Sequence, residues 1–190
     1  MTNTTVQSFT GTFDGDATVR KTGPADYTLG GSCTATHGPL ALEARVGTTF
    51  LVTDGAVVDV AEGAVVNLAG ARRLLGSVAG KGTLAHGTVS LLTVLDGSDI
   101  TLDAVMLLNG VWLGGVSSVA FVGDADVEGL PVHVADPAAV QAAHRTVISA
   151  TGTLTGEPAF TFGASGYKVK LTNDGKGYVV WRPGLMLVVR

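Results

Sequence analysis

The chain has 190 residues, which suits a single domain with a substantial buried core. Hydrophobic residues make up 46% of it and charged residues 15%, a balance that excludes a disordered tail and a long polar helix. The formal net charge of -4 supplies no broad positive field for phosphate backbones or anionic headgroups, so neither nucleic acid nor a membrane surface is an expected partner.

Glycine and cysteine narrow the class further. The 27 glycines are about twice the number that average usage would give, and their even spacing indicates turns between short strands. With Cys33 as the one cysteine, no intrachain disulfide is expected. Residues 1–9 lack the basic start and apolar run of a signal peptide, and no apolar stretch reaches the length of about 18 residues that would suggest insertion into a membrane.

Short β-prone runs begin in the N-terminal half. Between residues 41 and 122 they are separated by Gly, Asp or Asn at intervals of about 8 to 12 residues. The clearest units are residues 49–53, 56–60 and 64–68, and the rhythm continues through residues 76–84, 88–95 and 99–108. Alternation within each unit directs Val, Leu and Phe inward while Thr, Asp or Asn face outward.

This pattern predicts an all-β fold, and a right-handed parallel β-helix (β-solenoid) is favoured. Core residues are small and aliphatic, aromatic content is 6%, and similar units recur in tandem, as expected for a thin coil. No strict repeat period emerges, because the spacing between units varies. A β-sandwich or jelly roll therefore remains the alternative.

The C-terminal part departs from the repeats. Asp136 as N-cap, Pro137 at the first helical position and the helix formers up to His144 predict a short helix. Strands are expected at residues 146–150, 159–162, 167–171 and 178–181, and residues 173–177 indicate a hairpin between the last two. The domain is accordingly divided, within 1–190, into an N-terminal edge (1–40), repeat coils (41–135) and a helix with a C-terminal cap (136–190).

Two segments carry a family resemblance. Residues 74–84 with 87–91, and the terminal block of residues 146–156, 167–171 and 183–190, resemble repeats of autotransporter passenger domains and β-strand-repeat bacterial surface proteins. Phage tail proteins share such motifs. The resemblance covers about residues 41–190 and implies a right-handed parallel β-helix, export and a surface or adhesive role. The chain lacks a translocator barrel and is much shorter than most passengers.

Several acidic residues are candidates for chemistry. Asp124, Asp126 and Glu128 occupy the first, third and fifth positions of a calcium-type loop, with Gly129 at the sixth, but Ala135 stands where a bidentate Glu is expected. Solvent-facing turn residues are the preferred interpretation. The pair Asp14 and Asp16 would leave most of a calcium shell unfilled. Asp96, Asp99 and Asp103 could line up as the paired carboxylates of a polysaccharide-cleaving β-helix, but they fit turn and outward strand positions. Two or three of Asp96, Asp99, Asp103, Asp124 and Asp126 in one cleft would favour such an enzyme.

The remaining candidates are weaker. The histidines, His37, His86, His133 and His144, lack zinc-site spacing, and Cys33 has no local activating base. The glycine run at Gly76, Gly80 and Gly82 does not match a phosphate-binding loop around Lys81. Trp112 and Trp181, the latter beside Arg182, are expected to fill the core or seal the cap, although either could stack on sugars or form an interface.

These patterns predict no catalytic site, no metal and no cofactor. The expected function is a non-enzymatic extracellular structural or adhesive module of a bacterial surface protein, located outside the cell or on its surface. Its expected partners are another copy of the chain, joined through the solenoid ends, or a glycan or cell-surface receptor. The alternatives are a carbohydrate-active β-helix enzyme, a phage-type receptor-binding fragment, or a subunit of a self-assembling filament.

Overall fold

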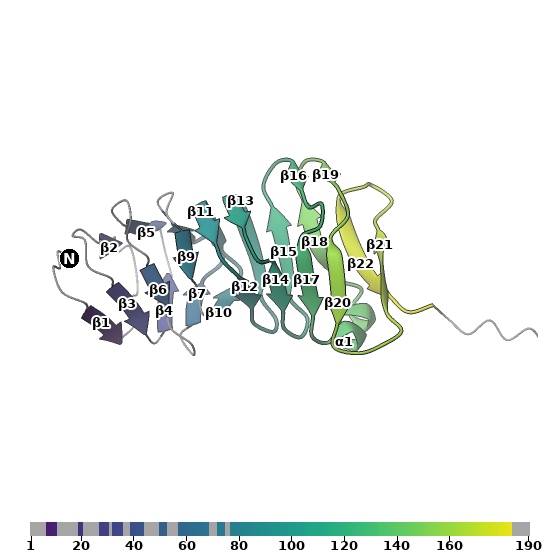
Figure 1. Ribbon diagram of the computed structural model, residues 1–190, viewed down its shortest axis with the longest axis horizontal. Helices are drawn as coiled ribbons and strands as arrows, with labels where there is room; N and C mark the ends of the chain where they lie inside the picture. The colour runs from purple at the N-terminus through teal and green to yellow at the C-terminus, as the bar shows by residue number, and fades with distance from the viewer. Residues whose placement is uncertain are drawn as a thin grey trace, which may run out of the picture.

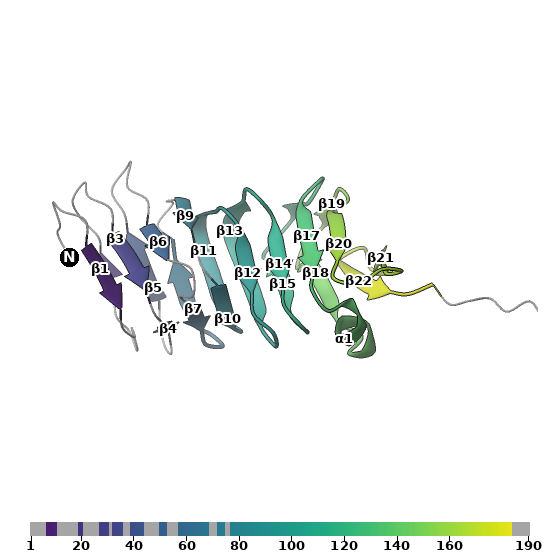
Figure 2. The ribbon, with the colours of Figure 1, turned by 60° about the horizontal axis from the view of Figure 1, so that its bottom comes forward.

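The computed structural model describes residues 57–68 and 77–183 in full, and residues 7–10, 19–20, 27–30, 32–35, 39–43, 50–52 and 72–74 by their backbone. It shows an all-β solenoid in which parallel coils stack along the long axis (Figures 1 and 2). The expected β-solenoid with a short helix and a C-terminal hairpin is confirmed. The β-sandwich alternative is wrong, because the described strands of the coils pair in parallel with the coil before and the coil after.

The coils form three faces. The first face is a seven-stranded sheet of β4 (Ser32–Ala35), β7 (Val57–Val60), β10 (Ser77–Gly80), β12 (Leu92–Val94), β14 (Val111–Leu113), β17 (Pro131–Val134) and β20 (Ala159–Phe162). The second comprises β2 (Val19–Arg20), β5 (Pro39–Glu43), β8 (Val65–Asn67), the first parts of β11 (Thr83–Val89) and β13 (Asp99–Leu107), β15 (Ser118–Phe121) and β18 (Thr146–Ala150). The third ends at β13 and comprises β1 (Gln7–Thr10), β3 (Tyr27–Gly30), β6 (Phe50–Val52), β9 (Arg72–Leu74) and the second parts of β11 and β13.

Strands β11 and β13 pass from the second face to the third and keep the same register on both sides of a bend. Both bend at residues with positive φ, His86 at 54° and Ala104 at 51°. Residues 85 and 87 pair with 103 and 105, so these two bends stack on each other. Two long strands thus form two faces each, which the sequence pattern did not predict.

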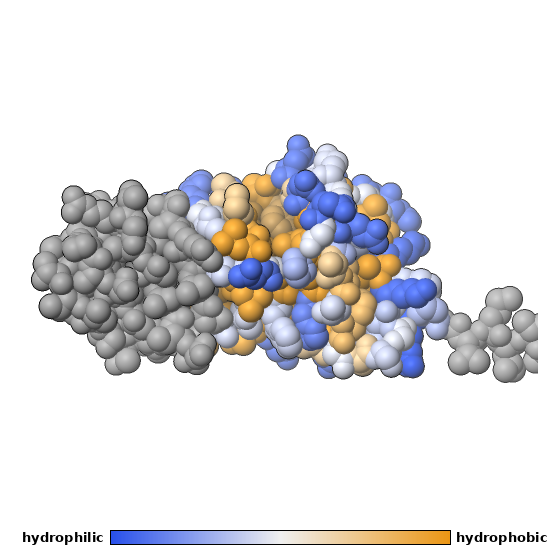
Figure 3. Space-filling model, in the orientation of Figure 1, coloured by the Kyte–Doolittle hydropathy of each residue, from blue (hydrophilic) through white to orange (hydrophobic). Residues whose placement is uncertain are grey.

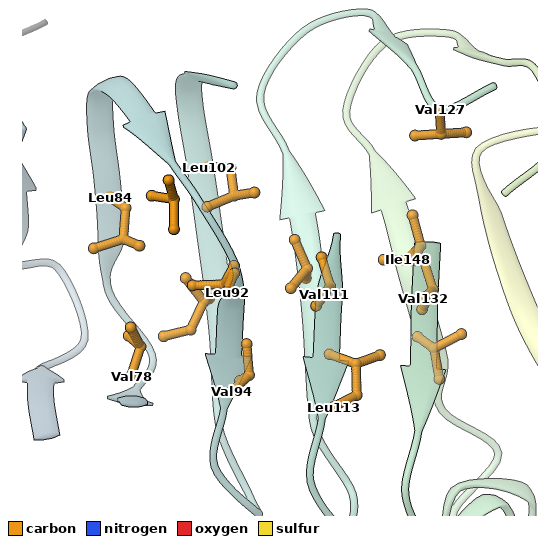
Figure 4. Close-up of a cluster of buried hydrophobic side chains, with 14 of the residues drawn as sticks. Val78, Leu84, Leu92, Val94, Leu102, Val111, Leu113, Val127, Val132 and Ile148 are labelled. Carbon is orange, nitrogen blue, oxygen red and sulfur yellow. The ribbon is translucent and has the colours of Figure 1, made fainter. Parts of the chain in front are cut away.

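The core runs through the middle of the coils. Burial alternates along the strands, as in β7, where Val58 and Val60 are buried between half-buried neighbours. This confirms the predicted alternation of apolar and polar positions. The largest fully buried side chains are Leu68, Leu84, Leu92, Ile100, Leu102, Leu113 and Ile148, and Figure 4 shows such side chains converging between the faces.

The coil length is not constant. Hydrogen-bonded residues on neighbouring coils are 19 apart at Ser118 and Asp99, but 29 apart at Thr153 and Asp124. The longer coil contains the helix and a protruding loop with β16 (Ala125–Asp126), which pairs with β19 (Leu154–Thr155) in the loop of the following coil as a separate two-stranded sheet (Figure 1). A variable coil length explains why the sequence yields no strict period.

One predicted strand is wrong in its bounds. Residues 88–95 were expected to form a single strand, but β11 ends at Val89 and β12 begins at Leu92. Ser90 and Leu91 form a corner there, and Asn109 on the next coil donates from its amide to the Ser90 hydroxyl at 2.9 Å. An apolar run can continue through a corner because the solenoid buries side chains on both sides of it.

The C-terminal elements cover the end of the second face. Helix α1 (Pro137–Ala142) begins after Asp136, whose side chain accepts the Ala139 N–H, which confirms the predicted cap. The hairpin of β21 (Lys168–Leu171) and β22 (Gly177–Trp181) is also confirmed, and β22 pairs antiparallel with β18. A strand of opposite direction ends the parallel ladder there.

Aromatic rings fill this end of the core, in contrast to the aliphatic coils. The Phe160 ring lies 6.2 Å from Phe162 and 5.7 Å from Tyr178, and Arg182 lies over the Tyr167 ring. The Tyr178 hydroxyl donates to the Gly156 carbonyl at 3.0 Å. Elsewhere in the stack, the next coil covers the apolar core. At this end, the larger aromatic rings cover it instead.

The buried Tyr178 makes stability sensitive to alkali. Only 7% of it is exposed, and burial raises its pKa above 10.0, with Glu157 and Glu128 raising it further. A raised folded-state pKa means that this stabilisation is fully present below the unfolded value of about 10 and is lost as pH rises through the folded value.

We therefore expect the wild type to lose more stability than Tyr178→Phe as the pH rises above about 10. At neutral pH, Tyr178→Phe should cost about 1 kcal/mol through the lost hydrogen bond. Urea titrations of both proteins across this pH range measure the difference. Parallel pH profiles would show that the phenol does not contribute to the alkaline loss.

Candidate functional site

Of the five acids considered for glycan cleavage, Asp124 and Asp126 line one groove, whereas Asp96, Asp99 and Asp103 do not converge. The Asp96 carboxylate accepts the Val116 N–H at 2.7 Å, across a turn of the next coil. Asp99 pairs with Arg145 and accepts the Ser118 hydroxyl at 2.7 Å. Asp103 lies on the same strand as Asp99, four residues on, so their backbones are about 13 Å apart. Two of the three carboxylates thus join one coil to another.

The acids of the calcium-type loop also bond to protein groups. Asp124 accepts the Thr153 N–H at 2.7 Å, and Glu128 accepts the Glu157 N–H at 2.9 Å. Asp126 accepts the N–H of Glu128 itself at 3.1 Å. These bonds hold the β16 loop against the β19 loop of the following coil. No group of three metal-binding side chains is found among the described residues, and Asp14 and Asp16 lie outside them.

The glycine run around Lys81 is a corner between faces. Gly80 has a φ of 95°, and the N–H groups of Lys81 and Gly82 both donate to the Val60 carbonyl at 2.9 Å. Backbone amides that already bond to a neighbouring coil form no cradle for phosphate. Cys33 pairs with Val58 in the backbone register of the first face, and Gly76 lies outside the described residues.

Trp112 lies outside the core, contrary to expectation. It is 45% exposed between the buried Val111 and Leu113, so strand alternation directs it outward from the first face. Its ring stacks on His133 with centroids 3.8 Å apart, and His133 Nδ1 lies 2.9 Å from the Thr161 hydroxyl. A thin coil filled by Val and Leu has no space for an indole.

Trp181 is likewise exposed, at 40%. It lies in the C-terminal hairpin, where its indole N–H donates to the Val169 carbonyl at 3.4 Å. Of the two places expected for it, the core and the cap, Trp181 takes the cap. Of the histidines, His144 follows α1 with a φ of 52°, and His37 lies outside the described residues.

A groove opens where the third face ends. Strand β13 pairs with β15 only as far as Leu102, opposite Phe121, whereas its second part pairs with β11 alone. The next strand along this side is β16, which pairs with β19 in the protruding loops. The space between is a groove of about 650 Å³, hereafter the edge groove, lined by His86, Gly87, Thr88, Leu102, Ala104, Val105, Met106, Phe121, Val122, Asp124, Ala125 and Asp126.

The edge groove combines apolar walls with acidic groups. Met106 and Val122 are 62% and 46% exposed, which is unusual for such side chains on a strand and its adjoining loop. Asp124 and Asp126 supply two carboxylates, and no Lys or Arg is among the described residues that line it. Sequence analysis missed this groove, since it depends on where pairing stops within a continuous strand.

Exposed apolar side chains also occur beyond the groove. Figure 3 shows apolar surface over the middle of the described coils. The large exposed residues are Leu91, Met106, Leu108, Trp112, Val122, Leu171 and Trp181. Several such side chains on one small domain suggest contact surfaces for other molecules.

Comparison of the chain with protein-family models, with curated proteins and with solved structures finds no match. No helix within the described part of the chain is long and apolar enough to cross a membrane.

Proposed function

We propose that this chain is a non-enzymatic β-solenoid module that acts as a structural or adhesive segment of a bacterial surface protein. The observation that carries the proposal is the use of its carboxylates. Asp96, Asp99, Asp124 and Glu128 each bond to a group on another coil. Groups held in this way reinforce a stack of coils.

The architecture suits a load-bearing role. The first face is hydrogen-bonded from β4 to β20, and the other faces run beside it around one core. Separating two coils would break several backbone bonds and expose buried Val and Leu together. A stack of this kind resists bending and presents its surface side chains at fixed spacing.

An outer location on a bacterial cell rests on the sequence resemblance to autotransporter passengers and β-strand-repeat surface proteins. In such a setting the module would hold other parts of the protein apart or contact a partner directly. Its partners would be a second copy of the chain, or a glycan or receptor on another cell.

The C-terminal end offers a surface for self-association. β21 ends the 13-stranded sheet and pairs with β22 alone among the described strands. It carries Leu171, which is 42% exposed and pairs with Tyr178, while the 40% exposed Trp181 lies at the other end of the hairpin, opposite Lys168. An edge strand with exposed apolar side chains is a template for pairing with another chain.

The test of the non-enzymatic role is incubation of the purified protein with a panel of bacterial and plant polysaccharides, followed by measurement of released reducing ends. We expect no release above the rate without protein. Release that is lost in Asp99→Asn or Asp103→Asn but kept in the matched change Glu62→Gln, at an exposed turn, would overturn the proposal.

A receptor-binding role is the second candidate, favoured by Trp112. One face of its indole is covered by His133, while its neighbour on the preceding coil is the short Thr93. This leaves room for a sugar ring or an apolar group beside the indole.

We expect oligosaccharides that bind there to change tryptophan fluorescence in the wild type and in Trp181→Phe, but not in Trp112→Phe. Titration of the three proteins against a glycan panel measures this. A fluorescence response that persists in Trp112→Phe would show that the oligosaccharide does not bind beside Trp112.

A further inference from the structure

We propose that the edge groove binds an extended peptide segment of a partner protein in which apolar residues alternate with Lys or Arg. This deepens the proposed function, on which it rests, by naming the chemistry of an adhesive partner. The inference draws on three features of the groove: its two strand edges, its apolar interior and its carboxylates.

The first edge belongs to β13. Leu108 N–H donates to the Val89 carbonyl on the β11 side. Because successive backbone groups on a strand point to opposite sides, the amide of Leu107 points away from β11 and toward the groove. Residues 105–107 have no described strand on that side. They form an unpaired length of the third face.

The second edge belongs to β16. The N–H groups of Ala125 and Val127 donate to Thr153 and Thr155 of the following coil, each at 2.9 Å. The amide of Asp126, between them, therefore points the other way, toward the groove. Two strand edges thus flank the same space, and they demand an extended backbone from any peptide that bonds to both.

The groove interior selects alternating side chains. Val105 and Phe121 are partly buried against the core, and Leu102 lies beneath with 1% exposed. An inserted strand would direct every second side chain onto these residues, where apolar groups displace water. Its other side chains would face outward past Met106 and Val122.

The charge of the edge groove determines which residues are favoured at the outward-facing positions of the peptide. Asp124 and Asp126 line the groove without a basic residue beside them, and the chain as a whole carries a net charge of -4. Hydrogen bonds from backbone N–H groups hold these two carboxylates in position. Lys or Arg on the peptide is therefore favoured, and a phosphate or nucleic-acid backbone is disfavoured.

The probe is a short, fluorescently labelled synthetic peptide in which valine alternates with lysine, with the valine–glutamate peptide as its charge-reversed control. Fluorescence anisotropy should show saturable binding of the lysine peptide and at least tenfold weaker binding of the glutamate peptide. Asp126→Asn keeps an oxygen that can accept the Glu128 N–H but removes the charge, and should weaken binding about fivefold. Glu62→Gln removes a charge from an exposed turn elsewhere and should leave binding unchanged.

Amide hydrogen exchange is a second test, because a loose electrostatic contact would not slow exchange at particular backbone amides. We expect the lysine peptide to slow exchange at Leu107 and Asp126 while leaving the exposed turn at Gly63 unchanged. Equal binding of both peptides, equal affinity of Asp126→Asn and Glu62→Gln, or binding without protection at the two edges would overturn the proposal.

Failure of this inference is distinguishable from failure of the proposed function. A protein that ignores the peptides but releases no sugars, and associates through its C-terminal edge, keeps its scaffold role and loses only the peptide site.

Discussion

Leu102→Ala is expected to lower the free energy of unfolding by about 2–5 kcal/mol, the range seen when a buried leucine leaves a cavity. Leu102 is 1% exposed in β13 and is flanked in register by Leu84 and Phe121. Stacked coils cannot close around the missing atoms without changing their spacing on all three faces. Urea unfolding followed by circular dichroism measures the loss.

Leu108→Ala is the matched control, because it removes the same atoms from the residue that directly follows β13, where the side chain is 41% exposed. Its cost should stay within about 0.5 kcal/mol. Equal effects of the two substitutions would contradict the assignment of Leu102 to the core and of Leu108 to the surface.

Gly110→Ala is expected to cost about 2–5 kcal/mol, because two separate penalties coincide there. Gly110 has a φ of 95°, in the left-handed region that disfavours a Cβ. A Cβ built on it would also lie 2.1 Å from the Pro131 carbonyl oxygen of the next coil. Relief of that contact requires β14 and β17 to separate, so backbone bonds weaken as well.

Gly97→Ala separates the two penalties. Gly97 also has a positive φ, at 73°, but a Cβ there would meet nothing within 4 Å. It should cost only the conformational penalty of about 1–2 kcal/mol. Thermal and urea unfolding of both variants give the comparison, and a Gly110→Ala cost no larger than that of Gly97→Ala would argue against close stacking of these coils.

Local patterns were sufficient to predict the individual elements. Strands β7 and β8 follow from the alternation in residues 56–68, because the inward and outward environments differ sharply across a thin sheet. Asp136 and Pro137 indicated the start of α1, and the turn at residues 173–177 indicated the hairpin of β21 and β22. Each of these signals depends on residues close together in sequence.

Features that depend on neighbouring coils were beyond the sequence. The edge groove exists because β15 stops at Phe121 while β13 continues to Leu107, and nothing local in either strand marks the mismatch. Trp112 was expected to fill the core or seal the cap, whereas its position between two buried neighbours directs it outward. The alternation of inward and outward positions along the strand was a better guide to the place of Trp112 than the apolar character of its side chain.

The acids illustrate the same limit. Their spacing in sequence was compatible with a calcium loop or with paired catalytic carboxylates. Their actual partners, such as Val116 for Asp96 and Thr153 for Asp124, are 20 and 29 residues away. Coil length decides which groups meet, and coil length is not constant in this chain.

A scaffold that contacts other molecules through its surface and its end should reveal this in solution. The most direct measurement is size-exclusion chromatography with light scattering over a concentration series, on the wild type and on Leu171→Asp at the exposed edge of β21. We predict a mass that rises with concentration for the wild type and stays monomeric for the variant. A monomer mass for the wild type at every concentration would contradict assembly through this edge.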